Sequence, residues 1–107
     1  MFDYSLYLVT DRTLSLGRST VEVVRAAIRG GVSCVQLREK GCSTREFMDE
    51  ARLLKALLAG TGVPLFINDR LDVALAVGAD GVHLGQNDLP IADARRLVGN
   101  RMIIGIS

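Results

Sequence analysis

The sequence predicts an α/β fold in which strands and helices alternate about a parallel sheet. Short apolar runs alternate with amphipathic segments that begin at Ser, Thr or Pro and end at glycine. Because no run is joined to the next by a hairpin turn, we expect crossovers between parallel strands. A parallel sheet needs both faces covered. Two architectures remain open: a small doubly wound sheet, or a parallel (β/α) barrel of TIM type, here about its first five strands and four helices.

Nine elements are expected, in a single domain over residues 1–107. In chain order they are strand 6–10, helix 19–31, strand 33–39, helix 43–62, strand 63–68, helix 69–79, strand 80–85, helix 89–100 and strand 101–107. LYLVT, SCVQLRE, VPLFIN, DGVHLG and RMIIGIS are strand-like runs. The first helix has a Ser/Thr cap and a closing glycine pair, and the second begins with capping-box spacing from Ser43 to Glu46. The third is the short run DRLDVALAVGA, and the fourth places Pro90 at its first position.

The composition is that of a globular domain, with 49% hydrophobic and 23% charged residues and a net charge of +1. This near-neutral balance argues against nucleic-acid binding, which needs a concentrated basic face. No run reaches the roughly 18 apolar residues of a membrane span, and MFDYSLYLVTDR is unlike a signal peptide. We therefore expect no membrane partner and a cytoplasmic location. Cys34 and Cys42 form neither a disulfide framework nor a metal-ligand motif.

Polar residues interrupt the second predicted strand. Residues two apart share a face, so Val35 and Leu37 are expected to pack on helices. Gln36 and Arg38 then lie on the other side, and Lys40 follows. A buried unpaired charge is costly, so an anion should meet these cations, and paired guanidinium and ammonium groups suit phosphate oxygens. The alternative is a solvated basic pair at a strand exit.

Further polar residues stand at the ends of later strands. Asn68 and Asp69 end the third, where they are helix caps or else a ligand donor and a hard-cation ligand. His83 is expected to point inward in the fourth strand, as a core residue or toward a ligand. Asp88 either caps the next helix or binds the same cation. Ser107 ends the fifth strand.

Together these residues describe one site. Ligands of parallel α/β folds bind at the carboxyl ends of the strands, where all of these side chains are expected. Two carboxylates with a few neutral oxygens suit Mg²⁺, which is commonly held by one or two carboxylates and substrate phosphates. Two cations suit the phosphate oxygens that the metal leaves uncovered. The set predicts a metal–pyrophosphate site better than a general acid–base site.

The motifs LYLVTD, GGVSCVQLREK, FINDR, DVALAVGADGVHLGQNDL and IIGIS resemble, in order and spacing, the thiamine-phosphate synthases. The resemblance runs over essentially the whole chain, and the combination of QLREK, IND and GADGVHLGQ is highly specific. It implies a (β/α)₈ barrel. It also implies the coupling of hydroxymethylpyrimidine diphosphate to thiazole phosphate, which gives thiamine phosphate and pyrophosphate in thiamine biosynthesis.

The resemblance also implies roles for individual residues. Gln36 contacts the pyrimidine, and His83 lines the pyrimidine side. Arg38 and Lys40 hold the pyrophosphate with Asn68, Ser107 lies by the diphosphate, and the Mg²⁺ ligands are Asp69 and Asp88. Arg38, Lys40 and Ser107 are thus the catalytic candidates. The reaction needs stabilisation of the leaving group's charge rather than a strong general base.

The chain is shorter than such a barrel, which runs to roughly 200 residues or more. Strands six to eight would be missing, with a later pyrophosphate-binding lysine and the loops for the thiazole phosphate. We expect either a fragment of a full enzyme or a short product that completes its barrel by association. The isolated chain should then have weak or no turnover. Its last strand, MIIGIS, should expose an apolar edge open to self-association.

Two other functions fit parts of the pattern. A thiazole tautomerase-like paralogue would share the barrel, but such proteins tend to lack the paired metal aspartates and the QLREK lysine. A non-catalytic α/β interaction module of the receiver type would cluster acids after the first strand, where this chain has only Asp11.

Overall fold

The computed structural model describes residues 7–10, 20–38, 41, 43–85 and 88–106. Within them all nine expected elements are present in the expected order. They are β1 (Tyr7–Val9), α1 (Thr20–Arg29), β2 (Cys34–Leu37), α2 (Thr44–Leu58), β3 (Leu65–Asn68), α3 (Leu71–Val77), β4 (Gly81–Leu84), α4 (Ile91–Val98) and β5 (Ile103–Ile106). Each element is shorter than its predicted range. The regular hydrogen bonds that define a helix or strand end before the sequence pattern does.

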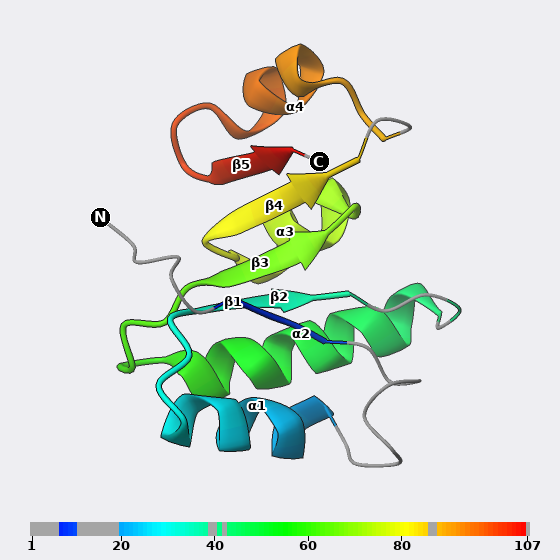
Figure 1. The fold of residues 1–107 in the computed structure, drawn as a ribbon. Helices are drawn as coiled ribbons and strands as arrows, with labels where there is room; N and C mark the ends of the chain where they lie inside the picture. Colours follow the sequence, from blue (N-terminus) through cyan, green and yellow to red (C-terminus); the bar gives the residue numbers. More distant parts are fainter. Residues whose placement is uncertain (1–6, 11–19, 39–40, 42, 86–87, 107) are drawn as a thin grey trace.

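The strand order resolves the architecture that the sequence pattern left open. The described strands form one parallel sheet in the order β1-β2-β3-β4-β5. A doubly wound sheet reverses its strand order at a switch point, whereas a TIM barrel adds each strand beside the previous one. The fold is therefore a partial (β/α) barrel. Figure 1 shows the strands side by side in chain order, with α1 and α2 at one end of the sheet and α4 at the other.

The two faces of the sheet differ in chemistry. The outer face packs against the helices through an apolar cluster whose strand residues are Val35, Leu37, Leu65, Ile67, Val82 and Leu84. These side chains are essentially inaccessible to solvent, which confirms that the alternate residues of β2 and β4 face helices. The inner face carries the intervening residues. From β2 to β4 these include Gln36, Phe66, Asn68, Gly81 and His83.

A local sequence signal sets the beginning of α2. The Ser43 hydroxyl accepts a hydrogen bond from the Glu46 N–H at 3.1 Å, and the Ser43 N–H donates to Glu46 Oε1 at 3.2 Å. The predicted capping box is thus confirmed. The predicted position of Pro90 in its helix was wrong by one residue. Its ψ of 145° is extended, so Pro90 is the N-cap of α4 rather than its first helical residue, and a fixed proline φ suits both positions.

None of the helices in the described part of the chain is long and apolar enough to cross a membrane. Cys34 is buried in β2, and Cys42 lies outside the described residues.

Candidate functional site

Gln36 and Asn68 meet on the inner face of the sheet. The Asn68 side-chain amide donates to Gln36 Oε1 at 2.7 Å. Both residues are buried: Asn68 is 9% exposed and Gln36 is 4% exposed. They come from neighbouring parallel strands at points 32 residues apart in the chain. The structure thus brings two of the predicted substrate-binding residues into direct contact. Each amide orients the other, so both are held in place before a ligand arrives.

Thr10 holds the end of β2, from which Arg38 emerges. Its N–H donates to the Gln36 carbonyl at 3.0 Å, and its hydroxyl accepts from the Arg38 N–H at 3.0 Å. Thr10 is buried and Arg38 is half-buried. Thr10 was not predicted from the sequence, although a hydroxyl directly after the apolar run LYLV was a usable signal. Lys40, the second predicted cation, lies outside the described residues.

Asp69 occupies a tight turn immediately after β3. Its φ of 67° lies in the left-handed region, which non-glycine residues rarely adopt. The Arg70 N–H donates to the Asn68 carbonyl at 2.8 Å and closes the turn, while the Asp69 N–H donates to the His83 carbonyl at 2.8 Å. The N-cap of α3 is Arg70, so the alternative that Asn68 or Asp69 is the helix cap is wrong. Strained conformations of this kind concentrate at functional sites.

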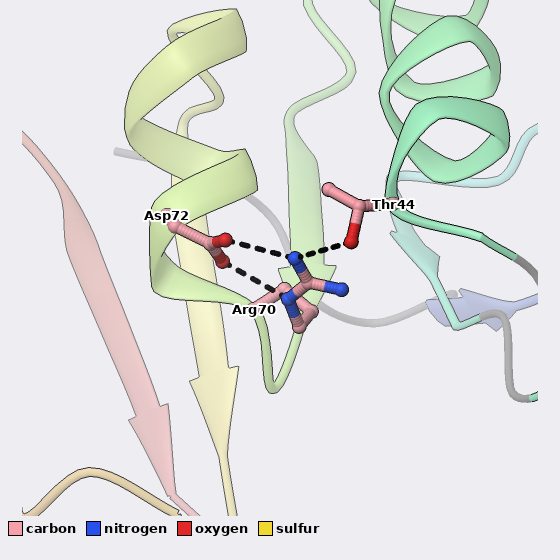
Figure 2. Close-up of polar contacts among 3 residues, drawn as sticks. All are labelled: Thr44, Arg70 and Asp72. Atoms are coloured by element: carbon pink, nitrogen blue, oxygen red, sulfur yellow. Dashed lines mark hydrogen bonds and ion pairs between the residues drawn. The ribbon is translucent and has the colours of Figure 1, made fainter.

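Arg70 anchors this turn to two helices, as Figure 2 shows. Its guanidinium donates to the Asp72 carboxylate at 3.0 and 2.8 Å and to the Thr44 hydroxyl at 3.1 Å. It also lies 5.9 Å from the centre of the Phe47 ring. The hydrogen bonds from Arg70 lower the pKa of the Asp72 carboxyl below its usual value. Arg70 is therefore a positioning residue behind Asp69. Arg70 was not predicted from the sequence, because its partners are distant in the chain or on the next helix.

Asp88 lies just beyond β4. Its carboxylate accepts from the Gly85 N–H at 2.6 Å, and its own N–H donates to the Gly85 carbonyl at 3.2 Å. Because Pro90 holds the N-cap position, Asp88 is not the cap of α4. The Asp69 N–H donates to the carbonyl of His83, two residues before Gly85. Both predicted metal ligands therefore flank the carboxyl end of the same strand.

His83 points to the inner face beside Asn68, its partner in the sheet register. Its Nδ1 is buried and has no hydrogen-bond partner within the part of the chain that the structure describes. Buried polar atoms are nearly always hydrogen-bonded. We therefore expect this nitrogen to have a partner other than the described residues. The observation is in line with a ligand-facing histidine rather than a hydrogen-bonded core histidine.

The donor set suits Mg²⁺ better than a transition metal. Among the described residues no three His, Cys, Asp or Glu side chains gather into a metal-binding cluster. A site of one or two carboxylates completed by phosphate oxygens and water is nevertheless the usual way in which Mg²⁺ is held. Asp69 and Asp88, beside the carboxyl end of β4, are the residues predicted to supply such carboxylates. Ser107, the last predicted site residue, lies outside the described residues.

Comparison with known proteins identifies the family. The family profile described as "Thiamine monophosphate synthase" matches residues 6–107. The chain belongs to this family. It is 63% identical over 105 residues to the thiamine-phosphate synthase of Syntrophomonas wolfei, covering 98% of this chain and 50% of that protein. It is 59% identical to the thiamine-phosphate synthase of Albidiferax ferrireducens, covering 95% of this chain and 47% of that protein.

A solved structure shares the fold of nearly the whole chain. Thiamine phosphate pyrophosphorylase from Pyrococcus furiosus superposes with a TM-score of 0.88 at 42% identity, over 96% of this chain and 49% of that chain. The chain thus spans about half the length of the relatives that it matches. The receiver-type module is wrong, since such domains reverse their strand order and this sheet does not.

Proposed function

We propose that the chain contributes the diphosphate half of a thiamine-phosphate synthase site. The reaction couples hydroxymethylpyrimidine diphosphate to thiazole phosphate and releases pyrophosphate. The observation that carries the proposal is the meeting of Gln36, Asn68, Asp69 and Asp88 around the carboxyl ends of β2, β3 and β4. The names of the relatives support the synthase over the tautomerase-like paralogue. A cytoplasmic location stays a prediction, made because the sequence has no membrane-span run and no signal-like N-terminus.

The reaction requires the protein mainly to stabilise the charge of the leaving diphosphate and to position the two substrates. The bond between the pyrimidine CH₂ and the diphosphate oxygen breaks with its electron pair leaving on the diphosphate, and the thiazole nitrogen lone pair forms the new C–N bond. Bound Mg²⁺ would neutralise the departing diphosphate. Arg38 and Lys40 stabilise the same charge from the end of β2. Gln36 and Asn68, already fixed by their mutual hydrogen bond, orient the pyrimidine and the diphosphate.

Calorimetry with inorganic diphosphate tests the proposal on the chain alone. We expect binding that needs Mg²⁺ and falls as salt rises, because charged groups hold the ligand. Inorganic sulfate with Mg²⁺ is the control, since one anionic group cannot bridge the cations and the metal. Binding that is the same with and without Mg²⁺, or no binding at all, would contradict the proposal.

We also propose that the chain self-associates through the β5 edge. Within the described residues β5 pairs only with β4, so its other edge is open. Ile106 of β5 is 54% exposed, and Ile91 and Leu97 of the neighbouring α4 are exposed as well. An open apolar strand edge favours pairing with another chain. Sedimentation equilibrium should give a mass above 11.6 kDa that Ile106→Lys lowers, whereas Leu53→Lys, at an exposed position on α2, leaves it unchanged. A monomer at all concentrations would refute this.

A further inference from the structure

We propose that Thr44 and Arg70 form a bridge that fixes the connection after β2 relative to the turn after β3, and that both are positioning residues for Mg²⁺-dependent diphosphate binding. Both roles rest on the proposed function, to which they add a link between the predicted cations and a predicted metal ligand. Thr44 is not among the predicted site residues. Its contact with Arg70, 26 residues away in the chain, points to it.

Two charged residues of the predicted site leave the sheet from neighbouring strands. Arg38 follows the end of β2 at Leu37, and Asp69 follows the end of β3 at Asn68. Leu37 and Ile67 are partners in the sheet register, so the two connections begin side by side at the carboxyl edge. A diphosphate held by cations on one connection and by a metal on the other needs a fixed distance between the two. Contacts that fix this distance therefore contribute to affinity.

The α3 end of the bridge is a bidentate ion pair. Arg70 Nε and Nη2 donate to the two carboxylate oxygens of Asp72 at 3.0 and 2.8 Å. Two parallel hydrogen bonds fix the plane of the guanidinium, which the single ammonium of a lysine cannot do. Because Arg70 directly follows Asp69, this anchor also restrains the turn whose φ is 67°.

The other end of the bridge lies on the first turn of α2. Arg70 Nη2 also donates to the Thr44 hydroxyl at 3.1 Å, as Figure 2 shows. The guanidinium carbon lies 5.9 Å from the centre of the Phe47 ring, and Phe47 is buried in the apolar cluster. Residues three apart share one face of a helix, so Thr44 and Phe47 contact the guanidinium together. Thr44 follows the Ser43 cap directly, so the bridge holds the point where the connection after β2 enters α2.

Replacing Thr44 tests the bridge without changing any charge. Thr44→Val keeps the shape of the side chain and removes its hydroxyl. We expect it to weaken Mg²⁺-dependent binding of inorganic diphosphate about fivefold in calorimetry, because the guanidinium loses its partner on α2. Thr44→Ser keeps the hydroxyl and should bind diphosphate within about twofold of the wild type.

Arg70→Met removes the guanidinium and keeps an unbranched apolar stem beside Phe47. It should weaken the same binding about tenfold, because the turn that carries Asp69 loses its anchor to α3 as well as its link to α2. In the Arg70→Met background, Thr44→Val should cause no further loss, since the guanidinium that the hydroxyl contacts is already gone. A merely destabilising effect of each substitution would add up instead.

Arg96→Met is the matched control. Arg96 forms an exposed ion pair with Asp93 at 3.4 Å on α4, a helix that carries no predicted site residue. It should leave diphosphate binding unchanged, and thermal unfolding checks that each variant is folded. If Arg70→Met does not fold, the two Thr44 variants carry the test.

Two results would overturn the bridge and leave the proposed function intact, because in both the wild-type chain still binds diphosphate with Mg²⁺. One is wild-type affinity in Thr44→Val, and the other is an equal loss in Thr44→Val and Thr44→Ser. A wild-type chain that does not bind diphosphate overturns both the bridge and the proposed function.

Discussion

Replacing Asp69 by asparagine is expected to weaken Mg²⁺-dependent diphosphate binding about 100-fold, or about 2.7 kcal/mol. Asparagine has the size of aspartate and tolerates the left-handed backbone better than most residues, so the turn at φ 67° should survive. What the substitution removes is the negative charge that a hard cation requires. The effect should therefore appear in the metal-dependent part of binding, measured by calorimetry at several Mg²⁺ concentrations.

Asp49→Asn is the matched control, because Asp49 is an exposed aspartate on α2 and not a predicted site residue. It should bind Mg²⁺ and diphosphate as the wild type does. Thermal unfolding of both variants separates loss of the ligand from loss of the fold. Full Mg²⁺ dependence retained in Asp69→Asn would exclude Asp69 as a metal ligand and leave its strained turn without a functional explanation.

Replacing either member of the Gln36–Asn68 pair by an apolar residue should lower the free energy of unfolding by about 1–3 kcal/mol. Asn68→Leu keeps the size of the side chain but leaves the buried Gln36 carbonyl oxygen without this 2.7 Å hydrogen bond. Gln36→Met does the same to the Asn68 amide. The double variant should lose less than the sum of the two, because an apolar pair of similar shape leaves neither buried amide without its partner. Urea unfolding of the four proteins measures the coupling.

Asn100→Leu, at an exposed position after α4, is the control for the loss of an amide and should change stability by less than about 0.5 kcal/mol. Strictly additive losses in Asn68→Leu and Gln36→Met would show that the two side chains act independently. The hydrogen bond would then have no part in ordering the site.

Local patterns in the sequence were enough for the elements and for the side of the sheet on which their residues lie. The capping box from Ser43 to Glu46 and the helix-facing Val35 and Leu37 are confirmed because each depends on neighbours a few residues away. A strand of period two also places Gln36 and Asn68 on the inner face. The family resemblance, confirmed by the comparisons, named the residues of the site. The roles that this resemblance implies for the site residues all stay predictions, those of Lys40 and Ser107 included.

Contacts between distant segments could not be predicted in this way. Periodicity says which face a residue occupies, but it does not say which strand lies next to it. The barrel order of the sheet, the support of Arg38 by Thr10 and the anchoring of the Asp69 turn by Arg70 all depend on such neighbours. Sequence patterns thus placed the polar groups of the site, whereas the packing of neighbouring strands decided how they are held.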